Sequence, residues 1–418
     1  MPRIRLKQPL LPVLTVFLIG LQLLEPSRIW LILLIPFLGL LAGSITWTWI
    51  LSRNLQLRRE SRLGWIEAGG QIEERLTLTN PTNFPAPILE VDDHSTLPGF
   101  IASRSTGVSA GSFDQWSVQA ICERRGTYQL GDAHVQLQDP FGIFEAVVHI
   151  QRTTSILVLP RLAPLPPFQI SPTGSSGDGP LRRLALQQSV HASTVREYVT
   201  GDNRKQIHWP TTARKDKLHV RLMDSTPEAG WWIILDLDEN FMLGSGVDSV
   251  EEQSVTLAAS LANAGLQGRK SVGLAGNCEV VTWLPPQKGE GQRWKIMQAL
   301  AIARPASQAL AHLLEKAGSS LGSQNSLIVI TPDVSLAWLA SLVSLMRHGL
   351  TPTILLIDTE SYGGSDSIQF ALGTLQGRGI PCHAIHRGMI KITKPPANKT
   401  DTWKWHMTPT GEVVPFSV

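Results

Sequence analysis

Two apolar segments near the N-terminus, neither with a single charged residue, constrain the fold of this chain most. They cover residues 10–24 and 29–51, and only the tetrapeptide EPSR separates them. At about 1.5 Å per residue, the second segment would reach about 34 Å as a helix, which exceeds a hydrocarbon core of about 30 Å. The first segment spans such a core only together with its flanking residues. The pair predicts a transmembrane helical hairpin over residues 1–54, bound to the lipid bilayer.

The charges around the hairpin predict its orientation. Basic residues lie at both of its outer ends: Arg3, Arg5, Lys7, Arg53, Arg58, Arg59 and Arg62. Because basic flanks stay on the cytoplasmic side, we expect a multi-pass protein of the cell inner (plasma) membrane with both termini cytoplasmic. A cleaved signal peptide is the alternative, but GLQLLEPS lacks the small-x-small pattern of a cleavage site.

Length and composition indicate a globular protein with more than one domain. The chain has 418 residues, of which 43% are hydrophobic and 17% charged, and its formal net charge is +3. That charge is too small to imply a polyanionic partner. Cys122, Cys278 and Cys382 are widely spaced, which favours reduced, buried thiols over a disulfide framework or a zinc site.

Residues 55–160 show the short alternating pattern of an all-β domain. In QIEERLTLTN, Ile72, Leu76 and Leu78 alternate with polar residues, and Gly or Pro breaks recur through the region. This spacing predicts an antiparallel β-sandwich of immunoglobulin-like type. Residues 161–228 follow as a Pro/Gly/Ser-rich linker and a charged aromatic segment, which we treat separately.

Apolar strands then alternate with amphipathic helices over residues 229–395. GWWIILDLD reads as a strand buried on both faces, and residues 249–268 read as a helix with Ser249 as its N-cap. The alternation predicts a doubly wound α/β domain with a parallel sheet. Residues 396–418 form a polar C-terminal tail.

Ligands of such sheets bind at the carboxyl ends of the strands. Asp236 and Asp238 close the first strand here, and Asp333 follows a later one. The arrangement resembles the von Willebrand factor A fold, whose first strand ends in Asp-x-Ser-x-Ser. Asp236 stands at the first position of that motif, while Asp238 and Asn240 replace its serines. The resemblance implies a Mg²⁺ site at Asp236, Asp238 and Asp333, but solvated strand ends or helix caps are the favoured interpretation, so no cofactor is expected.

The sequence contains none of the short motifs that mark common enzymes. G-x-S-x-G, the Walker loop, G-x-G-x-x-G after a strand and H-E-x-x-H are all missing from the 418 residues. The chain is therefore expected not to be an enzyme.

Residues 195–221 place a tyrosine, a tryptophan and a histidine among basic side chains. Ile207 and Trp209 alternate as in a strand, so we expect Trp209 to be buried in a brace between two domains. In KLHVRL, Leu218, Val220 and Leu222 would likewise face a core, with His219 outward. Nucleic-acid binding through this segment would need exposed aromatic rings, so no nucleic-acid partner is expected.

The segment REYVTGDNRKQIHWPTTAR resembles the signature of the DUF58 family, R-x-Y-x-x-G-D-x-x-R-x-I-x-W-x-x-x-A-R. The residues at the signature positions are Arg196, Tyr198, Gly201, Asp202, Lys205, Ile207, Trp209, Ala213 and Arg214, with Lys205 in place of an arginine. RRGTYQLG and DPFGIF, within residues 124–144, resemble two further elements of that family.

The resemblance implies a membrane hairpin, a von Willebrand A-like domain and a role as a cytoplasm-facing scaffold. It also implies a MoxR-type AAA+ ATPase as the partner in protein complex assembly. A metal-dependent function at Asp236, Asp238 and Asp333, and nucleic-acid binding through residues 195–221, remain the two alternatives. The sequence sets no oligomeric state.

Overall fold

The chain folds into a mixed α and β protein with an apolar N-terminal helix and several sheets, as the sequence predicts at that level. The computed structural model describes residues 3–61, 64–168, 170, 194–198, 209–222, 230–318, 321, 325–348, 350–390, 404–407 and 413–416. The chain divides after Pro160 into two compact units, which are described one at a time.

Two helices that pack against each other begin the first unit. They are α1 (Leu10–Leu24) and α2 (Arg28–Asn54). The Ser27 side chain accepts a hydrogen bond from the backbone N–H of Ile29 and so caps α2, which continues through Pro36. Within the described part of the chain, α2 is the helix that is long and apolar enough to cross a membrane. At 15 residues, α1 is shorter.

The rest of the first unit consists of two β-sheets around one hydrophobic core. Its strands are β1 (Arg3–Leu6), β2 (Gln56–Ser61), β3 (Trp65–Glu67), β4 (Gln71–Asn80), β5 (Ala86–Asp93), β6 (Arg104–Val108), β7 (Ser112–Ile121), β8 (Gly126–Gln138) and β9 (Phe144–Leu159). One sheet has the order β1-β9-β8-β5-β6, with β3 parallel to β9, and the other has the order β2-β4-β7. Ile72, Leu76 and Leu78 lie in the shared core, as their alternation predicts.

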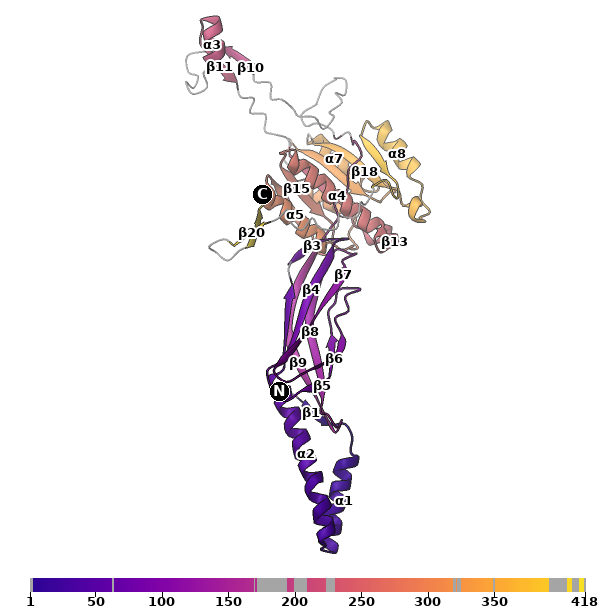
Figure 1. Cartoon of the computed structure of the whole chain (residues 1–418). Coiled ribbons are helices and arrows are strands. Elements are labelled where there is room, and N and C mark those ends of the chain that lie inside the picture. Colours follow the sequence, from indigo (N-terminus) through magenta and orange to yellow (C-terminus); the bar gives the residue numbers. More distant parts are fainter. Residues whose placement is uncertain are drawn as a thin grey trace. The chain divides into compact units, whose positions relative to one another are not determined.

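The hairpin is joined to this β-sandwich at both of its ends. Before α1, strand β1 pairs antiparallel with β9, with Leu6 opposite Phe144. After its apolar stretch, α2 buries Thr48 and Leu51 completely, and Leu51 and Leu55 belong to the core of the sandwich. Figure 1 shows β1, α1 and α2 at the same end of the sandwich. Leu51, the last residue of the apolar segment 29–51, therefore packs in the core of the sandwich.

The second unit is built on a six-stranded sheet with the order β16-β15-β12-β17-β18-β19. Its strands are β12 (Trp231–Leu235), β15 (Val272–Gly276), β16 (Thr282–Gln287), β17 (Ser326–Thr331), β18 (Thr351–Ile357) and β19 (Cys382–Ile385). All pairs are parallel except that of β15 with β16. Counted along the chain, this is the strand order 3-2-1-4-5-6 of doubly wound sheets.

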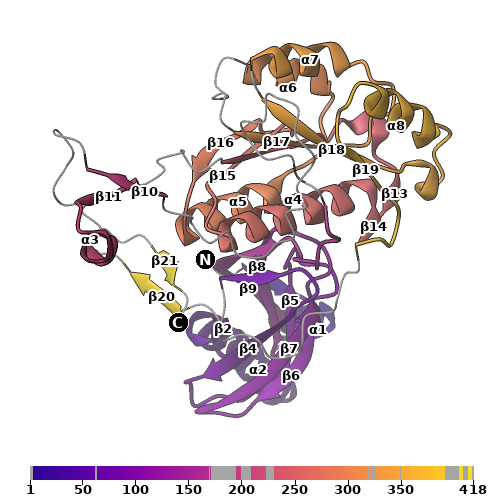
Figure 2. The same ribbon diagram turned by 90° about the horizontal axis from the view of Figure 1, so that it is seen from above.

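Helices cover both faces of this sheet. Figure 2 shows α4 (Val250–Gln267) and α5 (Glu290–Ile302) on one side, and α6 (Leu310–Ala317) and α7 (Leu339–Arg347) on the other. The last helix, α8 (Ile368–Gly377), packs near β19. Every residue of β12 is buried, which explains the uninterrupted apolar run in its sequence. Ser249 caps α4 by accepting a hydrogen bond from the backbone N–H of Glu252, as predicted.

The remaining elements are short. They are β10 (Thr194–Glu197), α3 (Trp209–Lys215), β11 (His219–Leu222), η2 (Glu239–Phe241), β13 (Gly244–Ser245), β14 (Asp248–Ser249), η3 (Glu360–Tyr362), β20 (Lys404–Met407) and β21 (Val413–Phe416). Of the predicted tail, 396–418, the two strands β20 and β21 are described, and they pair antiparallel.

Candidate functional site

The carboxyl edge of the parallel sheet is the first candidate site, because the strand order reverses between β12 and β17. Asp236 follows β12 at this point and is completely buried. Its Oδ1 accepts hydrogen bonds from Asn277 Nδ2 at 2.6 Å and from the backbone N–H of Asp238 at 3.2 Å. Its Oδ2 accepts a hydrogen bond from the Thr331 hydroxyl at 2.5 Å. Since Asn277 follows β15 and Thr331 ends β17, this carboxylate ties three adjacent strands together.

The environment of Asp236 also changes its acidity. Burial raises the pKa of this carboxyl to about 6, although the hydrogen bonds from Thr331 and Asn277 oppose the shift. A folded pKa above the ordinary value of 3.8 means that the proton binds more tightly in the folded state. The stabilisation from this group is therefore complete below about pH 4 and is lost as the pH rises through about 6.

The other two predicted acids, Asp238 and Asp333, are mostly buried and serve nearby turns. Asp238 Oδ1 accepts hydrogen bonds from the backbone N–H and the side-chain Nδ2 of Asn240, at 3.1 and 2.8 Å, and so caps η2. Asp333 Oδ1 accepts a hydrogen bond from the backbone N–H of Ser335 at 2.8 Å. The backbone N–H of Asp333 in turn donates to the Thr331 hydroxyl at 3.0 Å.

A magnesium ion needs near-octahedral oxygen ligands. Across the described ranges, no group of three or more His, Cys, Asp or Glu side chains is arranged so that it could hold a metal ion. Both carboxylate oxygens of Asp236, and Oδ1 of Asp238 and of Asp333, already accept hydrogen bonds from the protein. In this structure Asp236 links three adjacent strands, and Asp238 and Asp333 each accept a hydrogen bond within a turn. Mg²⁺ binding at these residues stays a prediction.

A second polar cluster at the same edge was missed by sequence reasoning. Asp358 follows β18 and His386 follows β19, and the His386 Nδ1 lies 2.7 Å from Asp358 Oδ2. The carboxyl group is buried while the imidazole is 57% exposed. A carboxylate that orients an exposed imidazole is the arrangement of a general base. The nearby Ser361 hydroxyl, however, donates to the Asp358 carbonyl and accepts from the Arg387 backbone N–H, so it serves the turn.

This cluster continues toward the N-terminal end of α4. Gln253 donates from Nε2 to the His386 carbonyl at 2.9 Å and accepts a hydrogen bond from the Tyr362 hydroxyl. Arg387 Nε donates hydrogen bonds to both carboxylate oxygens of Asp248, at 3.1 and 2.9 Å. Burial, with Asp248 nearby, raises the pKa of Tyr362 to about 12. A cavity of about 70 Å³ lies against Asp248, Gln253 and Tyr362. The cluster connects β14 and the first turns of α4 with the segments that follow β18 and β19.

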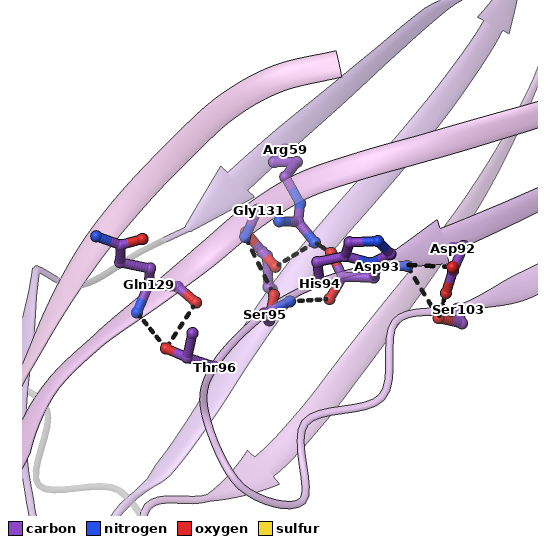
Figure 3. A network of polar contacts seen from close by, with 10 residues as sticks. Arg59, Asp92, Asp93, His94, Ser95, Thr96, Ser103, Gln129 and Gly131 are labelled. Carbon is purple, nitrogen blue, oxygen red and sulfur yellow. Dashed lines mark hydrogen bonds and ion pairs between the residues drawn. The ribbon is translucent and has the colours of Figure 1, made fainter. Parts of the chain in front are cut away.

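The first unit contains a buried cluster of charges at the end of β5. Arg59 in β2 is 5% exposed, and it forms ion pairs with Asp93 and, at 3.6 Å, with Glu74. Figure 3 shows how Asp93 also holds the following loop, since its carboxylate accepts from the backbone N–H of Ser95. Ser95 Oγ then accepts from the backbone N–H of Gly131. Arg59 therefore belongs to the protein interior and does not add to the basic flank of the hairpin.

The segment with the family signature is described only in part. Strands β10 and β11 pair antiparallel, and Lys217 Nζ contacts Glu197 Oε1 at 2.9 Å. Arg196 lies in β10, and the Tyr198 backbone N–H donates to the Leu218 carbonyl at 2.7 Å. Ala213 and Arg214 are exposed on α3. Four signature positions lie outside the described residues: Gly201, Asp202, Lys205 and Ile207.

The predicted burial of Trp209 is wrong. The indole is 66% exposed, because Trp209 begins the helix α3 and the alternation expected of a strand does not apply there. The predicted side-chain directions at residues 218 and 219 are wrong as well, since Leu218 is 44% exposed and His219 is buried. The imidazole of His219 is accommodated because its Nδ1 lies 2.7 Å from the Lys217 carbonyl oxygen. The segment therefore presents an aromatic ring to solvent.

Comparisons with known proteins agree with this signature. The family described as "Protein of unknown function DUF58" matches residues 194–358. The chain is 23% identical over 264 residues to the "Uncharacterized protein YeaD" of Bacillus subtilis (strain 168). That alignment covers 60% of this chain and 63% of the relative, so the chain spans less than two thirds of that protein.

Two solved structures are more distantly similar. An aerotolerance-related membrane protein from Bacteroides fragilis NCTC 9343 is 13% identical, with 45% of this chain and 81% of that chain covered and a TM-score of 0.25. The CARDB domain of the PF1109 protein from Pyrococcus furiosus is 9% identical, with 25% of this chain and 91% of that domain covered and a TM-score of 0.19. Scores this low carry no conclusion about function. The finding that agrees with the signature in the sequence is therefore the match of residues 194–358 to the DUF58 family.

Proposed function

We propose that this protein is a membrane-anchored, cytoplasm-facing scaffold without enzymatic activity, whose N-terminal hairpin crosses the inner membrane twice. The observation that carries the proposal is the attachment of both hairpin ends to one β-sandwich. Strand β1 precedes α1 and pairs with β9, and α2 ends with Leu51 and Leu55 in the core of the same sandwich. A segment that leaves and re-enters one folded unit crosses the bilayer an even number of times.

The exposed surface of the hairpin supports the membrane location. Large apolar side chains that would otherwise face water project from both helices: Leu10, Val13, Val16, Phe17, Leu23, Leu24, Ile29, Ile32, Leu33 and Ile35. An apolar surface of this extent on a water-soluble unit would be unfavourable. At the sandwich end, Arg53 lies over the Trp49 ring at 4.4 Å, a pairing suited to the membrane interface.

The charges favour a cytoplasmic location of both units. Arg5, Lys7 and Arg53 are exposed at the sandwich end of the hairpin. The turn at the opposite end carries Glu25 and Arg28, whose charges cancel. Because lysine and arginine are retained on the cytoplasmic side, the sandwich end faces the cytoplasm.

Cysteine labelling in intact cells tests this topology. In a background with Cys382→Ala, Glu25→Cys in the hairpin turn should react with a membrane-impermeant maleimide added from outside. Arg378→Cys, which is exposed in the second unit, should react only after lysis. Cys122 and Cys278 are buried and give little background. Labelling of Arg378→Cys in sealed cells would contradict the cytoplasmic location.

The partner that we propose is a MoxR-type AAA+ ATPase, as the family resemblance implies, and we place its contact on α3. Trp209 is exposed there, together with Arg214, and tryptophan and arginine are the residues most enriched at the centres of protein interfaces. None of the described side chains of α3 is buried, and the contact of this helix with β11 includes the hydrogen bond from the His219 backbone N–H to the Thr212 hydroxyl.

Crosslinking in native membranes tests this contact. The full chain, with ATP present, should recover an AAA+ ATPase, and Trp209→Ala should reduce the recovery by about tenfold or more, as for a hot spot of at least about 1.4 kcal/mol. Phe370→Ala is a matched control, because Phe370 is also an exposed aromatic residue in the second unit. Recovery that is equal for both variants would place the contact elsewhere, and repeated failure to recover any AAA+ ATPase would refute the partner.

Nucleic-acid binding through residues 195–221 is the second candidate function. The exposure of Trp209 favours it, since stacking on bases needs an accessible ring, and Arg214, Lys215 and Lys217 are exposed nearby. A salt-dependent shift of single-stranded DNA by the full chain, lost in Trp209→Ala, would favour this function over the scaffold.

A further inference from the structure

An apolar groove lies where the hairpin meets the β-sandwich. It has a volume of about 390 Å³, within the range of roughly 300–1,000 Å³ that small-molecule sites occupy. The residues that line it come from β1, α1, α2 and β9, and all are apolar: Leu6, Pro12, Leu38, Leu41, Ala42, Ile45 and Phe144.

The way in which the hairpin is attached creates this groove. Leu6 and Phe144 are opposite each other at the end of the β1–β9 pair, and the backbone N–H of Lys7 donates to the Ile143 carbonyl at 2.8 Å. The chain is thus held on the sheet until just before α1 begins. On α2, Ser44 and Thr48 face the protein and are buried, while Leu38, Ala42 and Ile45 lie on an exposed face. Ala42 is small and leaves space between that face and the end of the sheet.

Water is a poor occupant of this groove. A buried water needs two to four polar partners, and the seven lining residues are all hydrocarbon or aromatic. The groove is continuous with exposed apolar side chains of the hairpin, since Leu6, Leu38 and Ile45 are 48%, 43% and 44% exposed. If the hairpin lies in a bilayer, the groove opens to lipid chains.

The charges beside the groove indicate which kind of chain enters it. Arg5 and Lys7 flank Leu6 in the sequence and are both exposed. Cations at the membrane surface attract anionic headgroups. An acyl chain in the groove would bring its headgroup to the end of the hairpin where these residues lie.

We propose that this groove is a binding site for one acyl chain of an anionic phospholipid, whose headgroup phosphate lies near Lys7 and Arg5. The site rests on the proposed membrane anchorage. A lipid held here touches the hairpin and the sandwich at once and fills the joint between them.

Photocrosslinking of the full chain in nanodiscs tests the site. The discs contain phosphatidylethanolamine and phosphatidylglycerol, with a trace of phosphatidylglycerol that carries a diazirine in one acyl chain. In the unaltered chain, adducts should concentrate on residues 38–45 and 141–144. Ala42→Phe fills the groove from an exposed position and should reduce these adducts by about tenfold, which corresponds to about 1.4 kcal/mol of binding free energy.

Matched variants separate the site from general lipid contact. Leu31→Phe adds an aromatic ring at another exposed position of α2 and should leave the adducts on residues 38–45 unchanged. Lys7→Gln should reduce the preference for phosphatidylglycerol over a phosphatidylcholine probe with the same diazirine chain. Adducts on the exposed Phe17 side of α1 should be equal in all variants, since they report only that the hairpin is in the bilayer.

The outcomes distinguish this proposal from membrane anchorage. Adducts spread evenly along the hairpin, or unaffected by Ala42→Phe, would overturn the lipid site and leave the anchor intact. Crosslinks between two copies at residues 38–45 would show a second helix in the groove and would also overturn it. An absence of adducts on both Phe17 and the groove, with the chain released from membranes by carbonate, would refute the anchor and with it the lipid site.

Discussion

Arg59→Ala should destabilise the first unit by about 3–5 kcal/mol, the range for breaking a buried ion pair from one side. Glu74 is completely buried, and within the described structure neither of its carboxylate oxygens accepts a hydrogen bond. Burial raises the pKa of Glu74, the Arg59 charge opposes that shift, and Asp93 adds to it. Without the guanidinium, two buried carboxyl groups remain with no cation described in contact. Thermal unfolding of the full chain in detergent, followed by circular dichroism, measures the loss.

Arg58→Ala is the matched control for this prediction. Arg58 precedes Arg59 in β2, but its side chain is 72% exposed, and it pairs with the half-exposed Glu60. Exposed pairs of this kind contribute only about 0–1 kcal/mol. Adding Glu74→Gln to Arg59→Ala should recover part of the stability, because it removes one of the two uncompensated acids. Equal melting of Arg58→Ala and Arg59→Ala would show that the cluster does not stabilise the fold as argued.

Leu51→Ala should cost about 2–5 kcal/mol, the range measured for removal of a large core side chain. Leu51 is 0% exposed and lies in the hydrophobic core of the sandwich, although it belongs to a helix that reads as membrane-spanning. The substitution leaves a cavity where α2 joins the sandwich, so the unfolding temperature of the full chain in detergent should fall.

Leu33→Ala supplies the comparison for Leu51, since Leu33 is in the same helix but 41% exposed. A surface substitution of this kind changes stability by about 0.5 kcal/mol or less. If both variants melted alike, α2 would be an independent anchor that is merely tethered to the sandwich, and the argument for a fixed joint would fail.

The sequence predicts those elements whose pattern is local. Ile72, Leu76 and Leu78 are buried as their alternation requires, and Ser249 caps α4 through a contact only three residues away. The continuous apolar run of β12 also indicates its central position in the sheet, because only a strand covered on both faces can be apolar throughout.

The candidate site could be predicted only where its residues follow an obvious strand. Asp236 was found, but its partner Asn277 was not, because the two become neighbours only when β15 takes its place beside β12. Asp358 and His386 were missed for the same reason, since β18 and β19 must first become adjacent. Their common signal was a polar residue directly after an apolar strand.

The sequence pattern did not predict which charged residue is buried or which aromatic residue is exposed. Arg59 looked like one of several basic residues behind a membrane segment, and only the pairing of β2 with β4 brings it to Glu74. Trp209 looked like a core residue, and its position at the start of α3 leaves it in solvent instead.

The length of β9 has a consequence for how this protein could change over evolution. The strand runs for 16 residues from Phe144, beside the hairpin, to Leu159, next to the end of the first unit. At about 3.3 Å per residue, it acts as a spacer of about 50 Å between the hairpin and the point where the chain leaves the sandwich. Because side chains alternate from face to face, a change in its length by two residues, about 7 Å, keeps the core side inward. A change by one residue needs a bulge, such as the register shift that β8 and β9 already contain between Gly131 and Ala133.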